Sequence, residues 1–328
     1  MKIAFITDPI VQLDPTHDTT IALMEAAQAQ GHEIWVTSAS YLSIVQSQAW
    51  ARLQSVQLTP VTLEEEHWVA QKESYQLGNW ELHSLSTMDA VFMRTDPPVT
   101  IPYLYATQIL DLLTPTSTLV INSPLGLQRA NEKLYAMRFQ SVIPETIVSQ
   151  DKKVIREFVE RKEGAVLKPL GGKAGEGILF LEKRDKNLNS LIEISTQKGR
   201  EPVMIQTFLP EAKNGDKRII LLEGEPIGAV NRVPTGGEFR GNMAVGGRVE
   251  PAEITMRDWE ICSAIAPTLI EDGLYFVGID VIGGYLTEIN VTSPTGVREI
   301  DRLNQVSLGK QVIDWLQKKQ GQGAIGAL

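Results

Sequence analysis

The sequence contains very little cysteine and histidine, the residues that build disulfide frameworks and many transition-metal sites. Cys262 is the one cysteine among 328 residues, which excludes an intrachain disulfide and a zinc site made of several cysteines. The four histidines lack the His-Glu-x-x-His spacing of zinc proteases. Two further motifs are absent, a Walker phosphate loop (Gly-x-x-x-x-Gly-Lys-Ser/Thr) and a Gly-x-Ser-x-Gly nucleophile elbow. Any chemistry of this chain must therefore come from other residues.

Long apolar runs are also missing. No segment approaches the roughly 18 apolar residues that a membrane-spanning helix needs. The apolar start ends at Asp8-Pro9, short of the roughly 7–15-residue core of a signal peptide. We therefore expect no membrane partner and a place in the reducing cytoplasm. With 31 Lys+Arg against 40 Asp+Glu, the net charge of −9 also argues against nucleic acid as a partner.

The first third of the chain alternates between short apolar runs and helical periodicity. This alternation predicts a mostly parallel sheet with helices on its faces. The length of the whole chain suggests two or three domains. Residues 40–88 are polar and weakly periodic, and we assign them to no element. Strands are predicted at residues 3–7, 32–37, 89–95 and 119–122, and helices at 19–30 and 103–113.

Strand signals dominate after about residue 140, which indicates an α+β arrangement. The predicted strands are 165–170, 178–182, 203–208, 218–222 and 226–232. Residues 233–248 contain five glycines and no sustained apolar period, so we expect a functional lid or a linker there. The tail from residue 320 is rich in glycine and alanine and is expected to fray.

A glycine-rich loop follows a predicted strand that ends in a lysine. Lys168 precedes Gly171, Gly172, Gly175 and Gly177. Glycine allows backbone N–H groups to converge on an anion, and the lysine adds a mobile positive charge. The loop therefore indicates phosphate binding. The alternative is a flexible hairpin with a solvated lysine.

Two carboxylates interrupt apolar runs further along the chain, where an unpaired charge would be costly. Asp280 lies in the first run, and Glu288 and Asn290 share one face of the second. Three oxygen-bearing side chains suit Mg²⁺, which prefers carboxylates together with ligand phosphates. Asp280 lies opposite Glu288 only if the turn at residues 283–284 has a third residue or a bulge shifts the register. We predict this shifted register; the alternative is ordinary solvent-facing alternation.

Cationic side chains cluster beside glycines, prolines and predicted strand ends, although the chain as a whole is acidic. Arginine can hold a carboxylate or phosphate through two parallel hydrogen bonds. Together these residues indicate a site for phosphates and substrate carboxylates. They are Lys133, Lys168, Arg218, Arg232, Arg240, Arg248 and Arg298.

These residues, in this order, resemble the ATP-grasp superfamily and, more narrowly, the bacterial glutathione synthetases. The most specific runs are Thr-Glu-Ile-Asn-Val-Thr-Ser-Pro-Thr at 287–295, Arg-Gly-Asn at 240–242 and Gly-Gly-Arg at 246–248. Asn-Glu-Lys-Leu at 131–134 and Met-Arg-Thr-Asp-Pro-Pro at 93–98 also match. The resemblance implies an α/β and α+β chain: a Rossmann-like parallel-sheet domain (1–122) before a two-lobed ATP-grasp domain (123–320). Within the latter it implies a small lid lobe near 140–205 and a flexible loop at 233–248. Residues 321–328 are expected to be disordered.

The resemblance also implies an activity, the ATP-driven joining of γ-glutamylcysteine to glycine through an acyl phosphate to give glutathione, ADP and phosphate. It implies ATP as co-substrate, two Mg²⁺ ions (or Mn²⁺) on Asp280, Glu288 and Asn290, and a homo-oligomer, specifically a tetramer. The implied nucleotide contacts are Lys133, Lys168, Gly171, Gly172, Gly175, Gly177, Gln206, Phe208, Leu209 and Asp216. The implied substrate contacts are Arg218, Arg232, Arg240, Gly246, Gly247, Arg248, Ser293, Thr295 and Arg298, of which Arg218, Arg232 and Arg248 would be catalytic.

Three other functions stay open at this point. The chain could be a different ATP-grasp ligase, a nucleotide-binding module without catalysis, or a scaffold. The complete set of Asp280, Glu288 and Asn290 disfavours a module that only binds. The long arginine- and glycine-containing loop disfavours a scaffold.

Overall fold

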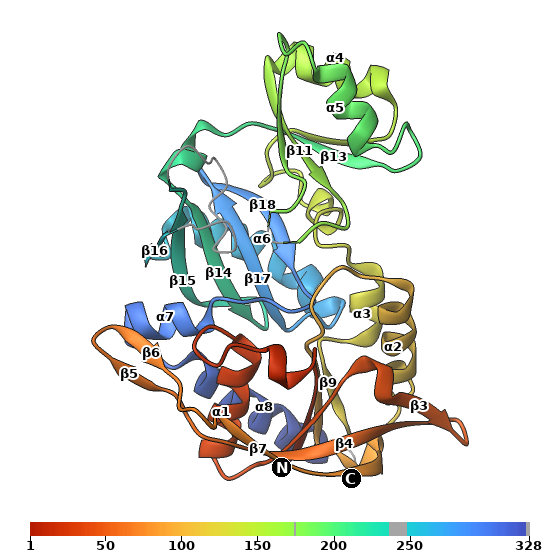
Figure 1. Cartoon of the computed structure of the whole chain (residues 1–328), viewed down its shortest axis with the longest axis vertical. Helices are drawn as coiled ribbons and strands as arrows, with labels where there is room; N and C mark the ends of the chain where they lie inside the picture. Colours follow the sequence, from red (N-terminus) through yellow and green to blue (C-terminus); the bar gives the residue numbers. More distant parts are fainter. Residues whose placement is uncertain (174, 236–247, 326–328) are drawn as a thin grey trace.

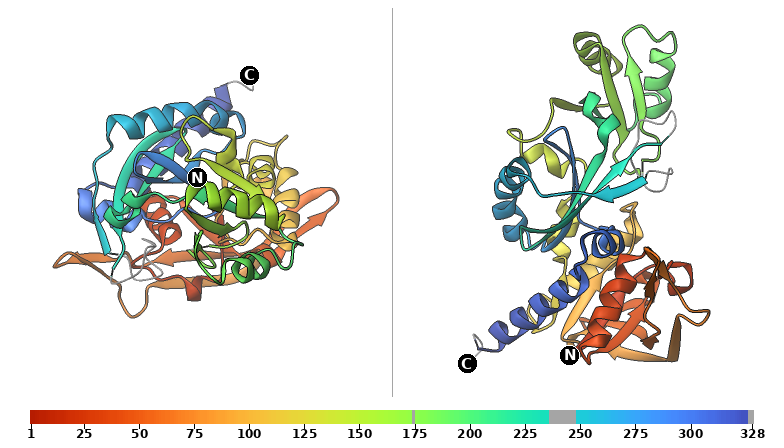
Figure 2. Two further views of the ribbon diagram at one scale, coloured as in Figure 1. Left: turned by 90° about the horizontal axis from the view of Figure 1, so that it is seen from above. Right: turned by 90° about the vertical axis from the view of Figure 1, so that its left-hand side faces the viewer.

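The computed structural model describes residues 1–173, 175–235 and 248–325, which form three main sheets with helices packed around them (Figure 1). The N-terminal sheet lies at one end of the molecule and a small lobe at the other, with a third sheet between them (Figures 1 and 2). Within the described residues, no helix is both long and apolar enough to cross a membrane.

The N-terminal sheet contains four parallel strands in the order β2-β1-β8-β9, as the alternating pattern predicts. In chain order, β2 is added beside β1 on one side, and β9 is added beside β8 on the opposite side. The direction of strand addition therefore reverses between β1 and β8. Ligands bind at such reversals, beyond the carboxyl ends of the strands. The elements are β1 (Lys2–Ile6), η1 (Ile10–Gln12), α1 (Thr19–Ala29), β2 (Glu33–Thr37), η3 (Leu85–Thr87), β8 (Ala90–Met93), α2 (Ile101–Asp111), β9 (Leu119–Ile121) and α3 (Pro124–Arg129).

Residues 40–88 add antiparallel strands to the edge of this sheet. The long strand β4 pairs with β2, β3 and β7. Its buried positions alternate with polar ones and include two alanines, Ala49 and Ala51, so its apolar signal in the sequence is weak. The elements are η2 (Ala39–Tyr41), β3 (Leu42–Val45), β4 (Gln48–Leu58), β5 (Thr62–Glu64), β6 (His67–Val69) and β7 (Tyr75–Ser84). Strands β5 and β6 form a separate two-stranded sheet.

The small lobe is an antiparallel sheet in the order β10-β13-β11-β12, and its two helices pack on that sheet (Figure 1). Helix α4 begins where the Asp151 carboxylate accepts the N–H of Lys153 at 2.7 Å, which satisfies one of the unpaired donors of the first turn. The elements, with the short helix that precedes them, are η4 (Tyr135–Arg138), β10 (Thr146–Ser149), α4 (Lys152–Lys162), β11 (Gly164–Pro169), β12 (Leu179–Glu182), α5 (Leu188–Ser195) and β13 (Val203–Thr207).

The middle sheet, which with its helices we call the large lobe, is antiparallel in the order β16-β15-β14-β17-β18. Asp280 pairs with Glu288, and a bulge follows at Asp280/Val281. The predicted register is therefore confirmed, and the bulge rather than a longer loop produces it, because Ile282 pairs with Tyr285. The elements are η5 (Pro210–Asn214), β14 (Asp216–Leu222), β15 (Glu225–Val233), β16 (Arg248–Pro251), α6 (Met256–Glu271), β17 (Phe276–Ile282), β18 (Tyr285–Asn290), α7 (Val297–Asn304) and α8 (Leu308–Ile325).

The tail expected to fray from residue 320 begins within α8, which continues to Ile325. Near this end, the side-chain amide of Gln320 donates hydrogen bonds to the backbone carbonyls of Asp89 and Ser117. The helix end therefore docks on the N-terminal sheet, which the glycine and alanine content of the tail does not reveal.

The buried side chains form three clusters that divide the molecule unevenly. The first contains Ile6 together with Ile279, and the second contains Phe5 together with Phe276. The N-terminal sheet and the large lobe therefore share their cores. The third cluster is confined to the small lobe and consists of Ile155, Phe158, Val159, Ala165, Leu167, Leu181, Leu188, Ile192, Val203 and Ile205.

Candidate active site

A cavity of about 270 Å³ lies between the small and large lobes. Strands β11 and β13 line it from one lobe, and β14, β15, β17 and β18 line it from the other. Most of the side chains singled out from the sequence meet here. The predicted residues that line the cavity are Lys133, Lys168, Gly172, Gly175, Gln206, Phe208, Leu209, Asp216, Arg218, Arg232, Asp280, Glu288, Asn290, Ser293 and Thr295.

Several other predicted site residues are not part of the cavity wall. Gly171 and Gly177 belong to the glycine-rich loop but do not line the cavity. Arg248 is 69% exposed and pairs with Glu250. Arg298 is buried and forms an ion pair with Glu25 at 2.8 Å. Arg240, Gly246 and Gly247 lie outside the described residues.

The cavity also contains residues that have no role assigned from the sequence. Asp96 and Pro97 come from the segment after β8, and Glu132 from the loop after α3. All three lie within the runs 93–98 and 131–134 that resemble the family. The sequence therefore pointed to these segments but not to the role of each residue. The other unassigned lining residues are Val166, Lys173, Glu176, Ile178, Thr207, Ala212, Ile282 and Thr287.

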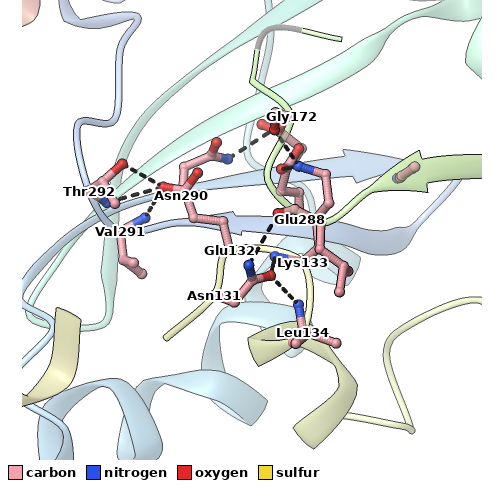
Figure 3. A network of polar contacts seen from close by, with 12 residues as sticks. Asn131, Glu132, Lys133, Leu134, Gly172, Glu288, Asn290, Val291 and Thr292 are labelled. Atoms are coloured by element: carbon pink, nitrogen blue, oxygen red, sulfur yellow. Dashed lines mark hydrogen bonds and ion pairs between the residues drawn. The ribbon is translucent and has the colours of Figure 1, made fainter. Parts of the chain in front are cut away.

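Lys133 links three parts of the site (Figure 3). Its Nζ donates to Glu288 Oε1 at 2.8 Å and to the carbonyl of Gly172 at 2.8 Å. The side chain is buried, so this charge is held in place by its partners. The Gly172 carbonyl belongs to the glycine-rich loop, and Glu288 to β18. Lys133 therefore ties the loop of the small lobe to the carboxylate of the large lobe.

Glu132 points the other way and fixes the chain just after β18 (Figure 3). Its Oε1 accepts the N–H groups of Val291 and Thr292, at 2.9 and 3.1 Å, and the Thr292 hydroxyl at 2.8 Å. Burial, and then the charge of Glu288, raises the pKa of Glu132 above its ordinary value. Glu132 therefore anchors the segment that leads from the carboxylate strand to Ser293.

Lys168 is the second lysine of the site and lies at the end of β11. Its Nζ donates to Gln206 Oε1 at 2.9 Å, across the β11–β13 pair. Burial lowers the pKa of Lys168, against the opposing effect of Glu288 and Asp216. An anionic ligand in the cavity would favour the charged form of this lysine.

An alternating chain of charges crosses the floor of the cavity. Asp280 Oδ1 accepts Arg218 Nε at 2.6 Å and Arg232 Nη2 at 3.0 Å. Arg232 Nη2 also donates to Asp216 Oδ2 at 2.5 Å. Asp216 Oδ1 and Arg232 Nε are buried and have no partner among the described residues. Such groups are costly unless a ligand, ion or water satisfies them.

The pKa values of the two carboxyl groups in this chain of charges shift in opposite directions. Burial is the largest effect on Asp216 and raises its pKa, despite the nearby charge of Arg232. Burial also acts to raise the pKa of Asp280, but the charges of Arg218 and Arg232 outweigh it, so the net shift is downward. Asp280 is therefore held as an anion.

The glycine-rich loop is compact because its glycines permit close contacts. A Cβ atom on Gly172 would lie 2.8 Å from the carbonyl oxygen of Glu176, within the same loop. Gly177 has a φ of +69°, which favours glycine. The loop thus needs glycine at both positions to turn back from Pro169 toward β12.

The oxygen-bearing side chains fit a divalent ion that shares its coordination with a ligand. Asp280 and Glu288 lie directly opposite each other, and Asn290 is two residues further along the same face. Within the described ranges, no group of three or more His, Cys, Asp or Glu residues could hold a metal alone. Mg²⁺ is usually held by one or two carboxylates together with substrate phosphates and water, so this donor set fits it.

Family models match both halves of the chain. Residues 1–128 match the N-terminal domain of prokaryotic glutathione synthetase, and residues 132–305 match its ATP-grasp domain. The glutathione synthetase of Synechocystis sp. is 63% identical, over 97% of this chain and 100% of that protein. The glutathione synthetase of Thermosynechococcus vestitus is 65% identical, over 96% of this chain and 99% of that protein.

Solved structures share the fold at much lower identity. D-cycloserine synthetase DcsG is similar with a TM-score of 0.62 and 15% identity, over 95% of this chain and 100% of that one. The ATP-grasp ligase PsnB, complexed with minimal precursor, Mg and ADP, has a TM-score of 0.61 and 17% identity, over 97% and 98%. The predicted ATP-grasp fold is therefore confirmed. With both family models matched and relatives above 60% identity over nearly the whole length, the chain belongs to the prokaryotic glutathione synthetases, ATP-dependent ligases that make glutathione.

Proposed function

We propose that the cavity between the two lobes is the place where this ligase binds ATP and joins γ-glutamylcysteine to glycine. One observation carries the proposal: two lysines, two arginines and the facing pair Asp280 and Glu288 converge on a single cavity of about 270 Å³. Phosphoryl transfer is the reaction type that needs such a set, because it depends on fixed charges that position and neutralise the phosphates.

Lys133 and Lys168 are the proposed contacts to the nucleotide phosphates. Both are buried and line the cavity: Lys133 donates to the Gly172 carbonyl of the glycine-rich loop, and Lys168 lies on β11 just before that loop. Gln206, Phe208 and Leu209 would contact the adenine, because the strand end that carries them offers backbone groups beside apolar surface. Asp216 is the proposed contact to the ribose.

Asp280, Glu288 and Asn290 are the proposed ligands of two Mg²⁺ ions, or of Mn²⁺ in their place. When bound, the ions would neutralise phosphate charge and orient the γ-phosphate. Lys133 already holds Glu288 Oε1, and Arg218 and Arg232 already hold Asp280, so the carboxylates keep their positions without a ligand. Little reorganisation is then needed when ATP binds.

The reaction itself needs positioning more than an activated side chain. A carboxylate oxygen of γ-glutamylcysteine attacks the γ-phosphorus, the bond to the β-phosphate oxygen breaks, and ADP leaves. The glycine nitrogen then attacks the acyl carbon, phosphate leaves with the bonding electrons, and the nitrogen loses a proton. Arg218 and Arg232 would bind the charged oxygens in both steps, and Ser293 and Thr295 would contact the peptide or glycine.

Three further expectations belong to this proposal and rest on the family resemblance. The lid expected at residues 233–248 lies mostly outside the described residues, which omit 236–247, and its exclusion of water from the acyl phosphate stays a prediction. The division at residue 122 would separate a substrate-side domain from the ATP-grasp domain. The enzyme would be a cytoplasmic homo-oligomer, specifically a tetramer, which light scattering coupled to gel filtration would measure.

The test of the reaction is phosphate release with ATP and Mg²⁺. We expect release only when γ-glutamylcysteine and glycine are both present, with glutathione appearing in equal amount by mass spectrometry. Release that needs neither substrate, or ATP binding without any turnover, would overturn the proposed reaction.

The test of the metal site is Glu288→Gln, which keeps the shape of the side chain and removes its charge. We expect turnover to fall by on the order of 10²–10³, as for removal of other electrostatic groups at a reacting centre. Glu160→Gln is the matched control, because Glu160 is exposed on α4 and pairs with Arg156 away from the cavity. A Glu288→Gln enzyme within about twofold of the control would remove Glu288 from the site.

A further inference from the structure

The segment from Ser293 to Glu299 begins with one wall of the cavity, Ser293–Thr295, and is held by residues of the N-terminal domain. Ser293 and Thr295 both line the cavity. The segment follows β18, which carries Glu288 and Asn290, and it runs into the first turn of α7. Its position therefore decides where two polar side chains meet the substrates.

Arg94 reaches this segment from the end of β8. Its Nη2 donates to the carbonyl of Pro294 at 2.9 Å, and its Nε donates to Thr20 Oγ1 at 3.1 Å, on α1. The guanidinium also lies over the ring of Phe276, 5.6 Å from its centroid. Arg94 is only 3% exposed, and it does not line the cavity. Arg94 therefore contacts the backbone of this wall without facing the cavity.

A second arginine holds the adjacent carbonyl from the large lobe. Arg218 Nη1 donates to the carbonyl of Thr295 at 3.0 Å, while its Nε holds Asp280 at 2.6 Å. Two consecutive carbonyls, those of Pro294 and Thr295, are thus held by arginines from two different parts of the chain. This arrangement leaves little freedom to the wall between the two contacts.

Arg298, in the first turn of α7, attaches the same segment to the N-terminal domain through its own side chain. Its Nη2 pairs with Glu25 Oε2 at 2.8 Å, and its Nε donates to the carbonyl of Pro15 at 3.1 Å. The carbonyl of Arg298 accepts Trp68 Nε1 at 2.8 Å, and the guanidinium lies over the Trp68 ring. From the sequence, Arg298 is expected to contact the substrate. In the structure its guanidinium is held by these partners and does not line the cavity.

Two smaller contacts complete the attachment to the start of α1. Thr19 Oγ1 accepts the N–H of Val297 at 3.3 Å, and His17 Nδ1 lies 2.9 Å from Glu299 Oε1. Apart from the hydrogen bond of Arg218, these contacts join residues 294–299 to the N-terminal domain. None of them is made to the small lobe, which carries Lys168.

We propose that Arg94 and Arg298 are positioning residues that fix the Ser293–Thr295 wall for the peptide and amino-acid substrates, while the ATP subsite is independent of them. This inference rests on the proposed function of the cavity. Misplacement of a substrate-binding group by about 1 Å can cost on the order of a hundredfold in rate. An arginine that holds two partners at fixed angles cannot be replaced by a lysine without losing one of them.

The test is Arg94→Lys, which keeps a buried positive charge but removes the guanidinium that donates to Thr20 and Pro294 at the same time. We expect kcat/KM for γ-glutamylcysteine or glycine to fall by on the order of tenfold or more. The dissociation constant for MgATP, measured by calorimetry, should stay within about twofold. Arg138→Lys is the matched control, because Arg138 pairs with Asp272 outside the cavity and should leave both constants unchanged.

Arg298→Lys and Thr20→Val give the same test without removing Arg94. Thr20→Val takes away the acceptor of Arg94 Nε and keeps every charge. Should Arg94→Lys fail to fold, a selective loss of kcat/KM in these two variants supports the inference. Wild-type kinetics in both, or a matching loss of MgATP affinity, overturns it. If the wild-type enzyme itself forms no glutathione, the proposed function fails instead.

Discussion

Asp301 is a half-buried carboxylate in α7 whose effect on stability depends on pH. Its Oδ1 accepts the N–H of Leu308 at 2.7 Å. Burial raises its pKa from 3.8 to about 6; the charge of Glu299 also raises it, and the charge of Arg298 lowers it. The folded protein therefore binds this proton more tightly than the unfolded chain. The resulting stabilisation is complete below the unfolded pKa and is lost as the pH rises through the folded pKa.

We expect Asp301→Asn to be more stable than the wild type near neutral pH, since the amide oxygen still accepts the Leu308 N–H and no charge is buried. Its advantage in unfolding free energy should grow by on the order of 1 kcal/mol between about pH 5 and pH 8. Urea unfolding curves of both proteins at the two pH values measure this. An advantage that shrinks as the pH rises would contradict the raised pKa.

The roles of individual residues are readable from the sequence only where local pattern fixes their surroundings. Asp280 and Glu288 interrupt apolar strands, so a partner or ligand had to exist, and their pairing across the sheet is observed. Arg298 shows the limit. Its partners, Glu25 and Pro15, are more than 270 positions away. No local spacing distinguishes an arginine that meets substrate from one that holds a neighbouring helix.

At the scale of elements, α3 packs so closely on the loop after α6 that one position must be glycine. A Cβ atom on Gly126 would lie 2.2 Å from the backbone carbonyl oxygen of Asp272. The same loop receives the hydroxyl of Tyr135 and the guanidinium of Arg138 on the Asp272 side chain, at 2.6 Å each. It is therefore poorly able to move away.

We expect Gly126→Ala to destabilise the protein by on the order of 2 kcal/mol, because overpacking against backbone outweighs the gain of about 1 kcal/mol in helix propensity. Gly321→Ala is the control. Gly321 lies in α8, and a Cβ atom added there would have no neighbour within 4 Å, so only the propensity gain should remain. Thermal unfolding of both variants decides the point, and equal shifts in the two would show that α3 is free to adjust.

Elements with strong periodicity were predictable and those with mixed faces were not. The apolar runs of β1 and β8 and the helical period of α1 led to a parallel sheet, which is what forms. Strand β4 is eleven residues long and was still not predicted. Its buried face includes two small alanines, its other face carries Trp50, and a register shift between Gln54 and Val56 interrupts the two-residue period.

At the scale of the whole molecule, the packing of the cores predicts which part can unfold while the rest stays folded. The small lobe has a core of its own, whereas the N-terminal sheet and the large lobe share two clusters. A unit with a separate core can unfold while the rest stays folded. The ATP subsite proposed here uses both sides of that division, with Lys168 on the small lobe and Glu288 on the large lobe.

Hydrogen exchange should therefore divide along the same line. Without ligand, we expect backbone amides in β11 and β13 to exchange on the order of tenfold faster than those in β14 and β17. With MgATP at about 100 times its dissociation constant, opening of the small lobe must break the ligand site. Exchange in β11 and β13 should then slow by up to about a hundredfold, equivalent to about 2.7 kcal/mol.

Lys168→Met separates ligand coupling from a general effect of the solution. The variant removes a buried charge from the ATP side of the cavity but keeps the small-lobe core, so its exchange without ligand should keep the same division. Added MgATP should protect its β11 and β13 amides much less than those of the wild type, because the phosphates lose a partner. If MgATP instead slows exchange equally in β11, β14 and α8, the molecule opens as one cooperative unit, and the separate core of the small lobe has no thermodynamic independence.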